Sequence, residues 1–203
     1  MGVTPPTNEQ VLWLSFQSGD EGAFQQLYQL HIRHLLNYGL RLCESVATVE
    51  DCIQDVFTEL WHYRQRVTQP ASVRFYLLKA LRNRLKAQYR REQPFISGWD
   101  DDRDEIGQAT FSIEPSAEQQ LIALDIDSER AAKIRLAMNA LSPRQREIIY
   151  LRYFNDLSYE QICELMNINY QTARSQIYSS LKQLRMLLKD KELSLLLPLF
   201  FFN

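Results

Sequence analysis

Hydrophobic residues recur at helical spacing along most of the chain, and no segment alternates between apolar and polar positions as a half-buried strand does. In the first half of the chain this spacing predicts helices over 8–17, 21–43, 48–62 and about 72–91. Gly19 and Asp20 break and cap the chain between the first two helices, and Pro70 marks the loop before the fourth. We therefore expect an all-α fold.

The helical period is lost over 93–117, where Gly and Pro residues flank the acidic run WDDDRDE at 99–105. The period resumes near Ala117, and Ser142 followed by Pro143 is a clear helix start. These features predict two small helical domains joined by a flexible acidic linker. The expected divisions are a first domain over 1–92, a linker over 93–127, a second domain over 128–190 and an apolar tail over 191–203.

The segment SYEQICELMNINYQTARSQIYSSLKQLR at 158–185 predicts two helices joined by a tight polar turn. Ser158 with Gln161 indicates a capping box on the first helix, and Asn169 can cap the second. The second helix has an apolar side, made by Ala173, Ile177, Leu181, Leu184 and Leu188, and a polar side, made by Gln171, Arg174, Ser175, Tyr178, Ser179, Lys182 and Arg185.

This arrangement is typical of a helix-turn-helix that lays its second helix in the DNA major groove. No acidic residue occurs over 165–189, and Gln, Arg and Ser can each bond base edges or phosphates. The alternative is a helical hairpin whose polar face is merely solvated.

In two predicted helices of the first domain, charged and polar residues of one kind gather on one face. The helix over 73–91 has seven basic residues and no acid, with aromatic side chains beside the charges, which favours binding of single-stranded nucleic acid. Leu77, Leu78, Leu81 and Leu85 form its expected core stripe. The helix over 48–62 places Asp51, Gln54, Asp55 and Thr58 opposite its apolar side, which suits docking on a basic protein surface or a solvated face.

The formal net charge of −2 hides an asymmetry along the chain. Residues 1–92 hold 11 basic and 9 acidic residues, residues 93–133 hold 3 and 10, and residues 134–203 hold 9 and 6. Two mildly basic ends therefore flank an acidic middle. The apolar tail LSLLLPLFFF at 193–202 is too short to span a bilayer, and it could pack on the second domain, contact a partner or graze a membrane.

The remaining chemistry argues against catalysis. Cys43, Cys52 and Cys163 are expected to be buried free thiols in a reducing cytoplasm, and the N-terminus lacks the order of a signal peptide. His31 and His34 share a helix face without acidic or Cys partners at metal-ligand spacing. We expect a cytoplasmic protein that is not an enzyme, with no catalytic residue, metal site, cofactor or small-molecule substrate.

Taken in order, VEDCIQDVFTELW (49–61), RFYLLKALRNRLKAQYRR (74–91) and the segment 141–185 resemble the bacterial RNA polymerase sigma factors of the extracytoplasmic-function (ECF) group, in the sigma-seventy family. The resemblance covers nearly the whole chain. It implies that Asp51, Gln54 and Asp55 bind the clamp coiled coil of the largest subunit of core RNA polymerase. It also implies that the helix 74–91 melts and reads the promoter −10 element, through Tyr76, Lys79, Arg82, Asn83 and Lys86.

The same resemblance makes 141–185 the −35-binding domain, which contacts duplex DNA through Gln171, Thr172, Arg174, Ser175, Tyr178, Ser179 and Lys182. The chain departs from the family at Ser179, where a basic residue is frequent, and at Gln171, where a Gly is frequent, so the preferred −35 sequence stays open. The linker is expected to pass through the polymerase. The family also implies an anti-sigma partner, often membrane-bound.

The expected function is therefore promoter recognition and transcription initiation at a specific regulon, with core RNA polymerase and promoter DNA, duplex and melted, as partners. Two alternatives remain from the sequence. One is a helix-turn-helix regulator with no polymerase role, and the other is a sigma-like interaction protein that titrates a regulator.

Overall fold

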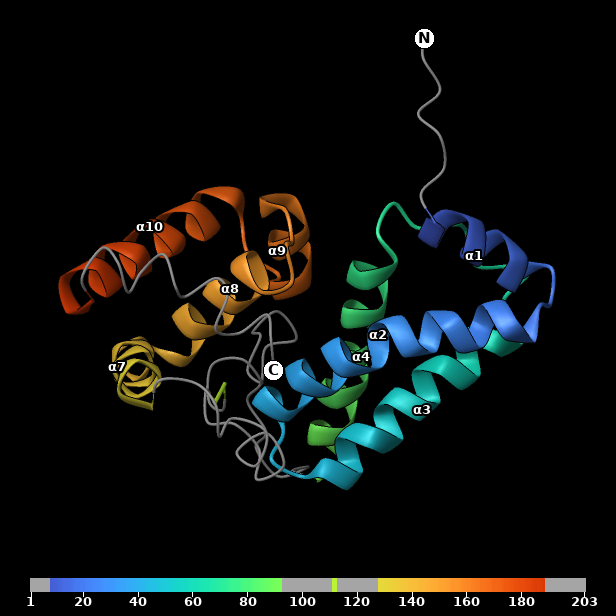
Figure 1. Ribbon diagram of the computed structural model, residues 1–203, viewed down its shortest axis with the longest axis horizontal. Coiled ribbons are helices and arrows are strands. Elements are labelled where there is room, and N and C mark those ends of the chain that lie inside the picture. Colours follow the sequence, from blue (N-terminus) through green and yellow to red (C-terminus); the bar gives the residue numbers. More distant parts are fainter. Residues whose placement is uncertain (1–7, 93–110, 113–127, 189–203) are drawn as a thin grey trace, which may run out of the picture. The chain divides into compact units, whose positions relative to one another are not determined.

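A computed structural model describes residues 8–92, 111–112 and 128–188 (Figure 1). The chain separates into two compact units, 1–93 and 94–203, and each is described by itself. Helices are the only regular elements in the described ranges, so the predicted all-α fold is confirmed. Within these ranges no helix is long and apolar enough to cross a membrane. The apolar tail, the acidic run and the helical pattern near Ala117 lie outside the described residues.

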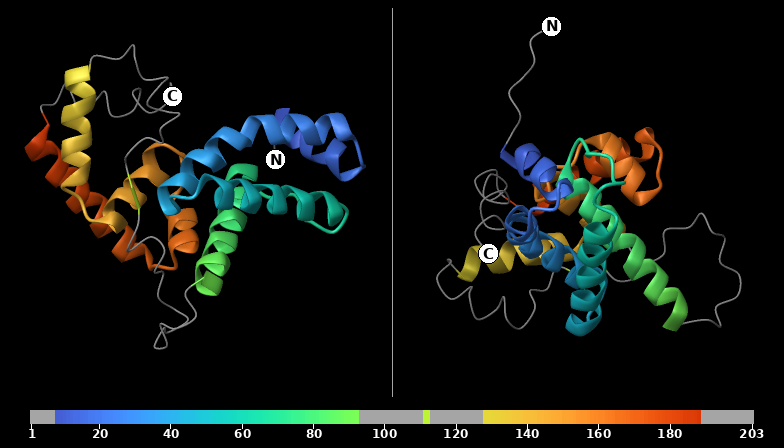
Figure 2. Two further views of the ribbon diagram at one scale, coloured as in Figure 1. Left: turned by 90° about the horizontal axis from the view of Figure 1, so that it is seen from below. Right: turned by 90° about the vertical axis from the view of Figure 1, so that its right-hand side faces the viewer.

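The first unit contains four helices, α1 (Asn8–Gln17), α2 (Glu21–Leu42), α3 (Val46–His62) and α4 (Val73–Glu92). Helix α1 packs on α2, while α2, α3 and α4 each pack on the other two (Figure 2). The Asp20 side chain accepts a hydrogen bond from the Ala23 amide and caps α2, as predicted. Helix α3 begins two residues earlier than expected, because Ser45 rather than Thr48 is its N-cap.

Aromatic rings hold the short helix α1 to the rest of the first unit. Trp13 and Phe16 are fully buried, and their ring centroids are 5.3 Å apart in an edge-to-face arrangement. The Phe16 ring also stacks on Phe24 of α2, and the Trp13 ring meets Tyr76 of α4 edge-on at 5.9 Å. Helix α1 is therefore part of the core of this unit, although its ten residues would be a marginal helix alone.

Helices α2, α3 and α4 approach closely at Gly39, which is buried in α2. A Cβ atom at this position would lie 2.5 Å from a Val49 methyl carbon of α3 and 3.5 Å from a Leu81 methyl carbon of α4. The absence of a side chain at Gly39 thus sets how closely the three helices pack.

The second unit contains α7 (Ser128–Asn139), α8 (Pro143–Tyr153), α9 (Tyr159–Met166) and α10 (Tyr170–Leu187). Helices α8, α9 and α10 pack on one another, and α7 packs on α10. The start of α8 predicted at Ser142 is confirmed, with Pro143 in the first turn and a complete capping box. The core of this unit includes Ile148, Leu151, Ile162, Ala173 and Leu184, all fully buried.

The three cysteines are free thiols, as expected, but only one of them is buried. Cys52 faces the core from α3, and burial raises the pKa of its thiol. Cys43 and Cys163 are partly exposed, so the prediction of burial is wrong for both. Cys43 is the C-cap of α2, where the chain leaves the helix, and a helix end has fewer packing neighbours than its middle.

We predict that Gly39→Ala destabilises the first unit. The new methyl group would overlap Val49, which costs about 1–3 kcal/mol in a packed core, whereas the better helix propensity of Ala returns about 1 kcal/mol. Urea unfolding of the full chain should therefore show a lower midpoint. The control is Gly22→Ala at an exposed position of α2, where the new Cβ atom would approach the exposed Asp20 side chain at 3.2 Å rather than packed core residues, so it should lower the midpoint less. Equal midpoints for the two variants would contradict the close approach.

Candidate nucleic-acid interface

The turn between α9 and α10 has the geometry that the sequence predicted. Ser158 and Gln161 form a complete capping box on α9. Asn167 ends α9 with a φ of 47°, a left-handed conformation that Asn tolerates better than most residues. Asn169 then caps α10, because its Oδ1 accepts a hydrogen bond from the Thr172 amide at 2.8 Å. The two helices are thus joined by a short turn whose polar groups are satisfied locally.

Helix α10 buries one side and exposes the other. Ala173, Ile177 and Leu184 are buried as predicted, but Ser180 is fully buried where Leu181, which is only half-buried, was expected. Ser180 fits the core side because its hydroxyl donates to the Gln176 carbonyl at 2.7 Å, which satisfies it within the helix. Sequence reasoning chose the more apolar of two neighbouring positions, whereas the helical phase places Ser180 inward.

The exposed side of α10 brings together the residues predicted to contact −35 DNA. Only Thr172 among them is half-buried, and its amide belongs to the helix cap. Arg174, Tyr178 and Lys182 make no hydrogen bond or ion pair with the described part of the chain, so their polar atoms face solvent. The exposed members are Gln171, Arg174, Ser175, Tyr178, Ser179 and Lys182.

The hydroxyl groups on this face have local partners. Ser175 Oγ donates to the Thr172 carbonyl and Ser179 Oγ donates to the Gln176 carbonyl, both at 3.0 Å. Gln145 Nε2 of α8 also lies 3.5 Å from Ser179 Oγ, at the outer limit for a hydrogen bond. Each hydroxyl still has lone pairs that can accept a bond from a base or a water molecule.

Sequence reasoning missed an aromatic and basic group beside this face. Tyr170, half exposed, is the first residue of α10, and its ring lies 5.5 Å from that of Tyr159, the first residue of α9. The Arg152 guanidinium lies 5.3 Å from the Tyr159 ring centre. Each tyrosine directly follows the N-cap residue of its helix, Ser158 or Asn169. This shared position in the sequence is the signal that could have indicated that the two rings lie together.

Helix α4 buries the predicted leucine stripe but also one residue that was assigned to DNA. Leu77, Leu78, Leu81 and Leu85 are all buried, as predicted. Arg82 is only 3% exposed, and its Nη1 donates to the Tyr38 hydroxyl at 2.5 Å. The prediction that Arg82 lies on the nucleic-acid face is therefore wrong for this structure. Position 82 follows Leu78 by one turn, which carries it to the core side whatever its charge.

The other predicted residues of α4 remain accessible. Asn83 is exposed, while Tyr76, Lys79 and Lys86 are half-buried. Burial raises the pKa of Tyr76, so its hydroxyl stays protonated at neutral pH and can donate a hydrogen bond. These four residues leave α4 with a mixed aromatic, amide and basic surface.

Arg84 of α4 finds its counter-charges on another helix, α3. Its guanidinium pairs with Asp55 of α3 at 2.9 Å and with Glu59 of the same helix. The hydrogen bond to Glu59 raises the pKa of Arg84. Asp55, which was predicted to bind polymerase, is therefore also engaged in an ion pair within the unit. Asp51 and Gln54 are exposed on the same helix.

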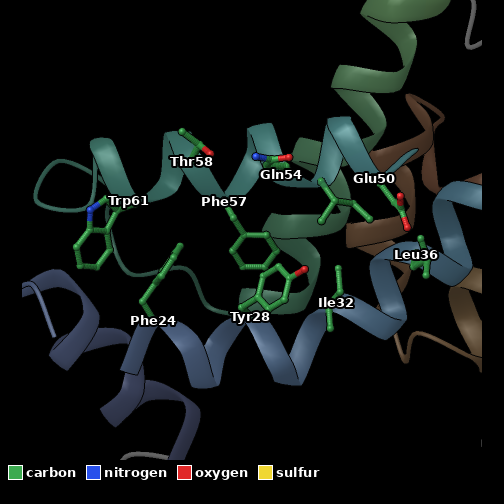
Figure 3. Close-up of a pocket in the computed structure, with 10 residues that line it drawn as sticks. Phe24, Tyr28, Ile32, Leu36, Glu50, Gln54, Phe57, Thr58 and Trp61 are labelled. Carbon is green, nitrogen blue, oxygen red and sulfur yellow. The ribbon is translucent and has the colours of Figure 1, made fainter. Parts of the chain in front are cut away.

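A groove of about 530 Å³ lies between α2 and α3, and the sequence did not predict it (Figure 3). Its floor is largely aromatic, with Phe24 and Tyr28 from α2 facing Phe57 and Trp61 from α3. Gln54 belongs to its lining, so one predicted polymerase-binding residue sits at the groove. The groove results from helix packing and has no signature in either helix alone.

The histidines belong to no group of three or more potential metal ligands within the described residues. His31 is buried, and its Nε2 lies 2.8 Å from Glu9 Oε1 of α1. Burial, together with the charge of Arg74, lowers the pKa of His31 to about 4, so the imidazole is neutral at pH 7. His31 is therefore a core residue of the first unit.

Comparisons with known proteins match this arrangement. Residues 27–95 match the family model described as sigma-70 region 2, and residues 131–184 match the model described as sigma-70, region 4. The first range covers most of α2 and all of α3 and α4, and the second covers α8, α9 and most of α10, so the exposed residues of α3, α4 and α10 described above fall inside them. The chain is an RNA polymerase sigma factor of the sigma-70 family, in the ECF group.

Proteins named as sigma factors are similar to this chain over most of its length. The sigma factor NccH of Alcaligenes xylosoxydans xylosoxydans is 25% identical over 193 residues, which cover 94% of this chain and all of NccH. The ECF sigma factor SigK of Mycobacterium bovis BCG is 21% identical over 82% of this chain and 86% of SigK. Among solved structures, the sigma factor RpoE in complex with the anti-sigma factor NepR from Bartonella quintana shows the same fold. Its TM-score is 0.55 and its identity 24%, over 82% of this chain and 97% of that chain.

We predict that Arg82→Ala acts mainly on stability. The substitution removes a buried guanidinium and leaves the Tyr38 hydroxyl in the core without this donor, which should lower the free energy of unfolding by about 2–4 kcal/mol. Thermal unfolding of the full chain measures this loss. Lys86→Ala, one turn along the same helix and half-buried, is the matched control and should change stability by less than about 0.5 kcal/mol. Equal stability of the two variants would contradict the core position of Arg82.

Proposed function

We propose that this sigma factor uses its two units to hold two separate promoter elements. The first domain, 1–92, docks on core RNA polymerase and holds the melted −10 element. The second domain, 128–190, binds the −35 element as duplex, and the acidic linker 93–127 passes through the polymerase between them. The match of the two units to regions 2 and 4 of the family supports this division.

The observation that carries the −35 assignment is the two-sided character of α10. Its buried side packs on α8 and α9, so the exposed side is presented as a rigid surface. Arg174 lies on that surface with its guanidinium free of partners in the described chain, and Arg can bond guanine in the major groove in two places. Tyr178, 70% exposed, offers a ring for contact with a thymine methyl group. Ser179 and Gln171 then tune which −35 sequence is preferred.

For the −10 element we propose a reduced set of α4 residues. Tyr76, Lys79, Asn83 and Lys86 combine a ring, two positive charges and an amide, which suits unpaired bases and their phosphates. Arg82 contributes indirectly, because it holds the helix in place through Tyr38. The aromatic contact with Trp13 limits the motion of the Tyr76 ring, which lowers the entropy that base stacking would cost.

For the polymerase contact we propose the exposed face of α3. Asp51 and Gln54 are available there, and Asp55 joins them while also pairing with Arg84. A basic clamp surface would meet carboxylates and an amide along one helix face. The ion pair between Asp55 and Arg84 also links this docking helix to the −10 helix.

The remaining partners follow from the family. The RpoE relative was solved in complex with an anti-sigma factor, and we propose that an anti-sigma protein binds this chain as well. The protein works on core polymerase and therefore acts in the cytoplasm. Its contribution is binding and DNA melting without catalysis, and no metal, cofactor or small-molecule substrate takes part.

We predict that Arg174→Ala lowers promoter discrimination by about 1–3 kcal/mol, because it removes a bidentate base contact. Transcription with purified core polymerase on a genomic-fragment library first identifies a promoter that depends on this protein. Initiation is then compared on this promoter and on versions with altered −35 bases. Arg185→Ala, also basic and exposed on α10, is the control and should weaken all sequences nearly equally. A wild-type preference among −35 sequences in Arg174→Ala would contradict the base contact.

We predict that Asp51→Lys weakens core-polymerase binding at least tenfold, because it reverses a charge on the proposed docking face. Asp51 is exposed and takes part in none of the ion pairs of Arg84, so folding should be unaffected. Binding of fluorescent full-length protein to core polymerase measures the effect. Glu44→Lys makes the same charge change on the exposed loop before α3 and should bind normally. An equal loss of polymerase affinity in both variants would indicate a general charge effect and would contradict the proposed docking face.

A further inference from the structure

Phe111 is a buried residue in the middle of the stretch between α4 and α7. It is 1% exposed, although it belongs to neither helix. Its ring centroid lies 5.6 Å from that of Tyr150 in α8, and the Tyr150 ring stacks on Phe154 at 5.2 Å. Phe111 and these two partners belong to the same unit. A side chain of the connecting stretch therefore completes an aromatic cluster of the helix-turn-helix unit.

We propose that Phe111 is a positioning residue that fastens the connecting stretch to the −35-binding unit and so sets the effective length of the tether between the two DNA-reading units. This inference rests on the proposed function. It alters the boundaries expected from the sequence, because the −35 unit then begins at Phe111 rather than at residue 128.

The number of residues in the tether sets an upper limit on the distance that it can span, with and without docking of Phe111. From Glu92, the end of α4, to Phe111 is 19 residues, which span at most about 65 Å when fully extended. From Glu92 to Ser128, the start of α7, is 36 residues, or at most about 125 Å. Docking of Phe111 thus removes nearly half of the maximum reach.

The distance between the promoter elements lies between these two limits. Positions −35 and −10 are about 25 base pairs apart, which is about 85 Å along B-DNA at about 3.4 Å per pair. A tether of about 65 Å is shorter than this interval, so the dimensions of the two units must supply the remaining distance. Each base pair added to the spacer then increases the distance that the two units and the tether must span. A tether of about 125 Å would impose no limit. Docked Phe111 therefore restricts the spacing between −35 and −10 elements that one molecule can bridge.

The first test measures docking in the full chain by thermal unfolding. Phe111→Ala should lower the midpoint of the second unit by about 10 °C, because it removes a buried ring. Leu136→Ala removes a side chain of α7 that is 71% exposed in the same unit and should leave the midpoint nearly unchanged. Phe111→Ala and Tyr150→Leu should also be non-additive, as expected for residues in contact. Strict additivity would overturn the docking of Phe111, whatever the protein's function.

The second test uses two insertions that leave every described residue intact. Ten Gly/Ser residues are inserted either after Gly98, before Phe111, or after Ala117, beyond it. Transcription is measured on promoters whose spacer varies in steps of one base pair. Only the insertion before Phe111 should widen the range of spacers used, and Phe111→Ala should widen it as well, whereas Phe111→Leu should keep the wild-type range.

The outcomes separate this proposal from the proposed function. Unfolding of the second unit would lower activity equally on all spacers, while a longer tether changes the shape of the spacer profile. Equal profiles for the two insertions, whether both widened or both unchanged, would overturn the role of Phe111 in spacing. Absence of promoter-dependent transcription by the wild-type protein would instead overturn the proposed function, and the unfolding test would still decide the docking.

Discussion

The close packing at Gly39 is the contact on which the first unit depends. At this point α2 carries no side chain, and Val49 of α3 and Leu81 of α4 fill the space that a Cβ atom would need. Helix α3 carries the proposed polymerase contacts and α4 carries the proposed −10 contacts, so one junction sets the geometry between them. Protein cores are packed too tightly to absorb a displacement at such a point, which makes the two faces parts of one rigid body.

Electrostatics reinforces the same link. Arg84 of α4 pairs with Asp55 and Glu59 of α3 at the surface, and Arg82 is held inside by Tyr38 of α2. Exposed pairs contribute little stability individually, but they orient one helix relative to another. Of the basic residues on α4, these two thus serve the fold, whereas Lys79 and Lys86 belong to the proposed −10 contacts. On this proposal, the basic residues of α4 are divided between structure and recognition.

The second unit meets a similar requirement with different means. Helix α10 must bury one side to be rigid and expose the other to read bases. Capping at Ser142, Ser158 and Asn169 fixes where α8, α9 and α10 start. The aromatic cluster of Tyr150 and Phe154 receives Phe111 from the connecting stretch. The unit thereby includes a residue that, by its place in the sequence, belongs to the linker.

The sequence by itself determined the all-α class, most of the helices and the caps at Asp20, Ser142, Ser158 and Asn169, because periodicity and capping depend on residues three or four positions apart. It also determined the exposed face of α10 and the family, which rest on the same local patterns. Tertiary structure alone decided the burial of Arg82 and Ser180, the pairing of Arg84, the groove between α2 and α3 and the docking of Phe111. Each of these is a contact between segments, or a helical phase set by such contacts. A charged residue near a core stripe, or a lone Phe in an acidic stretch, has the same local pattern whether it is exposed or packed.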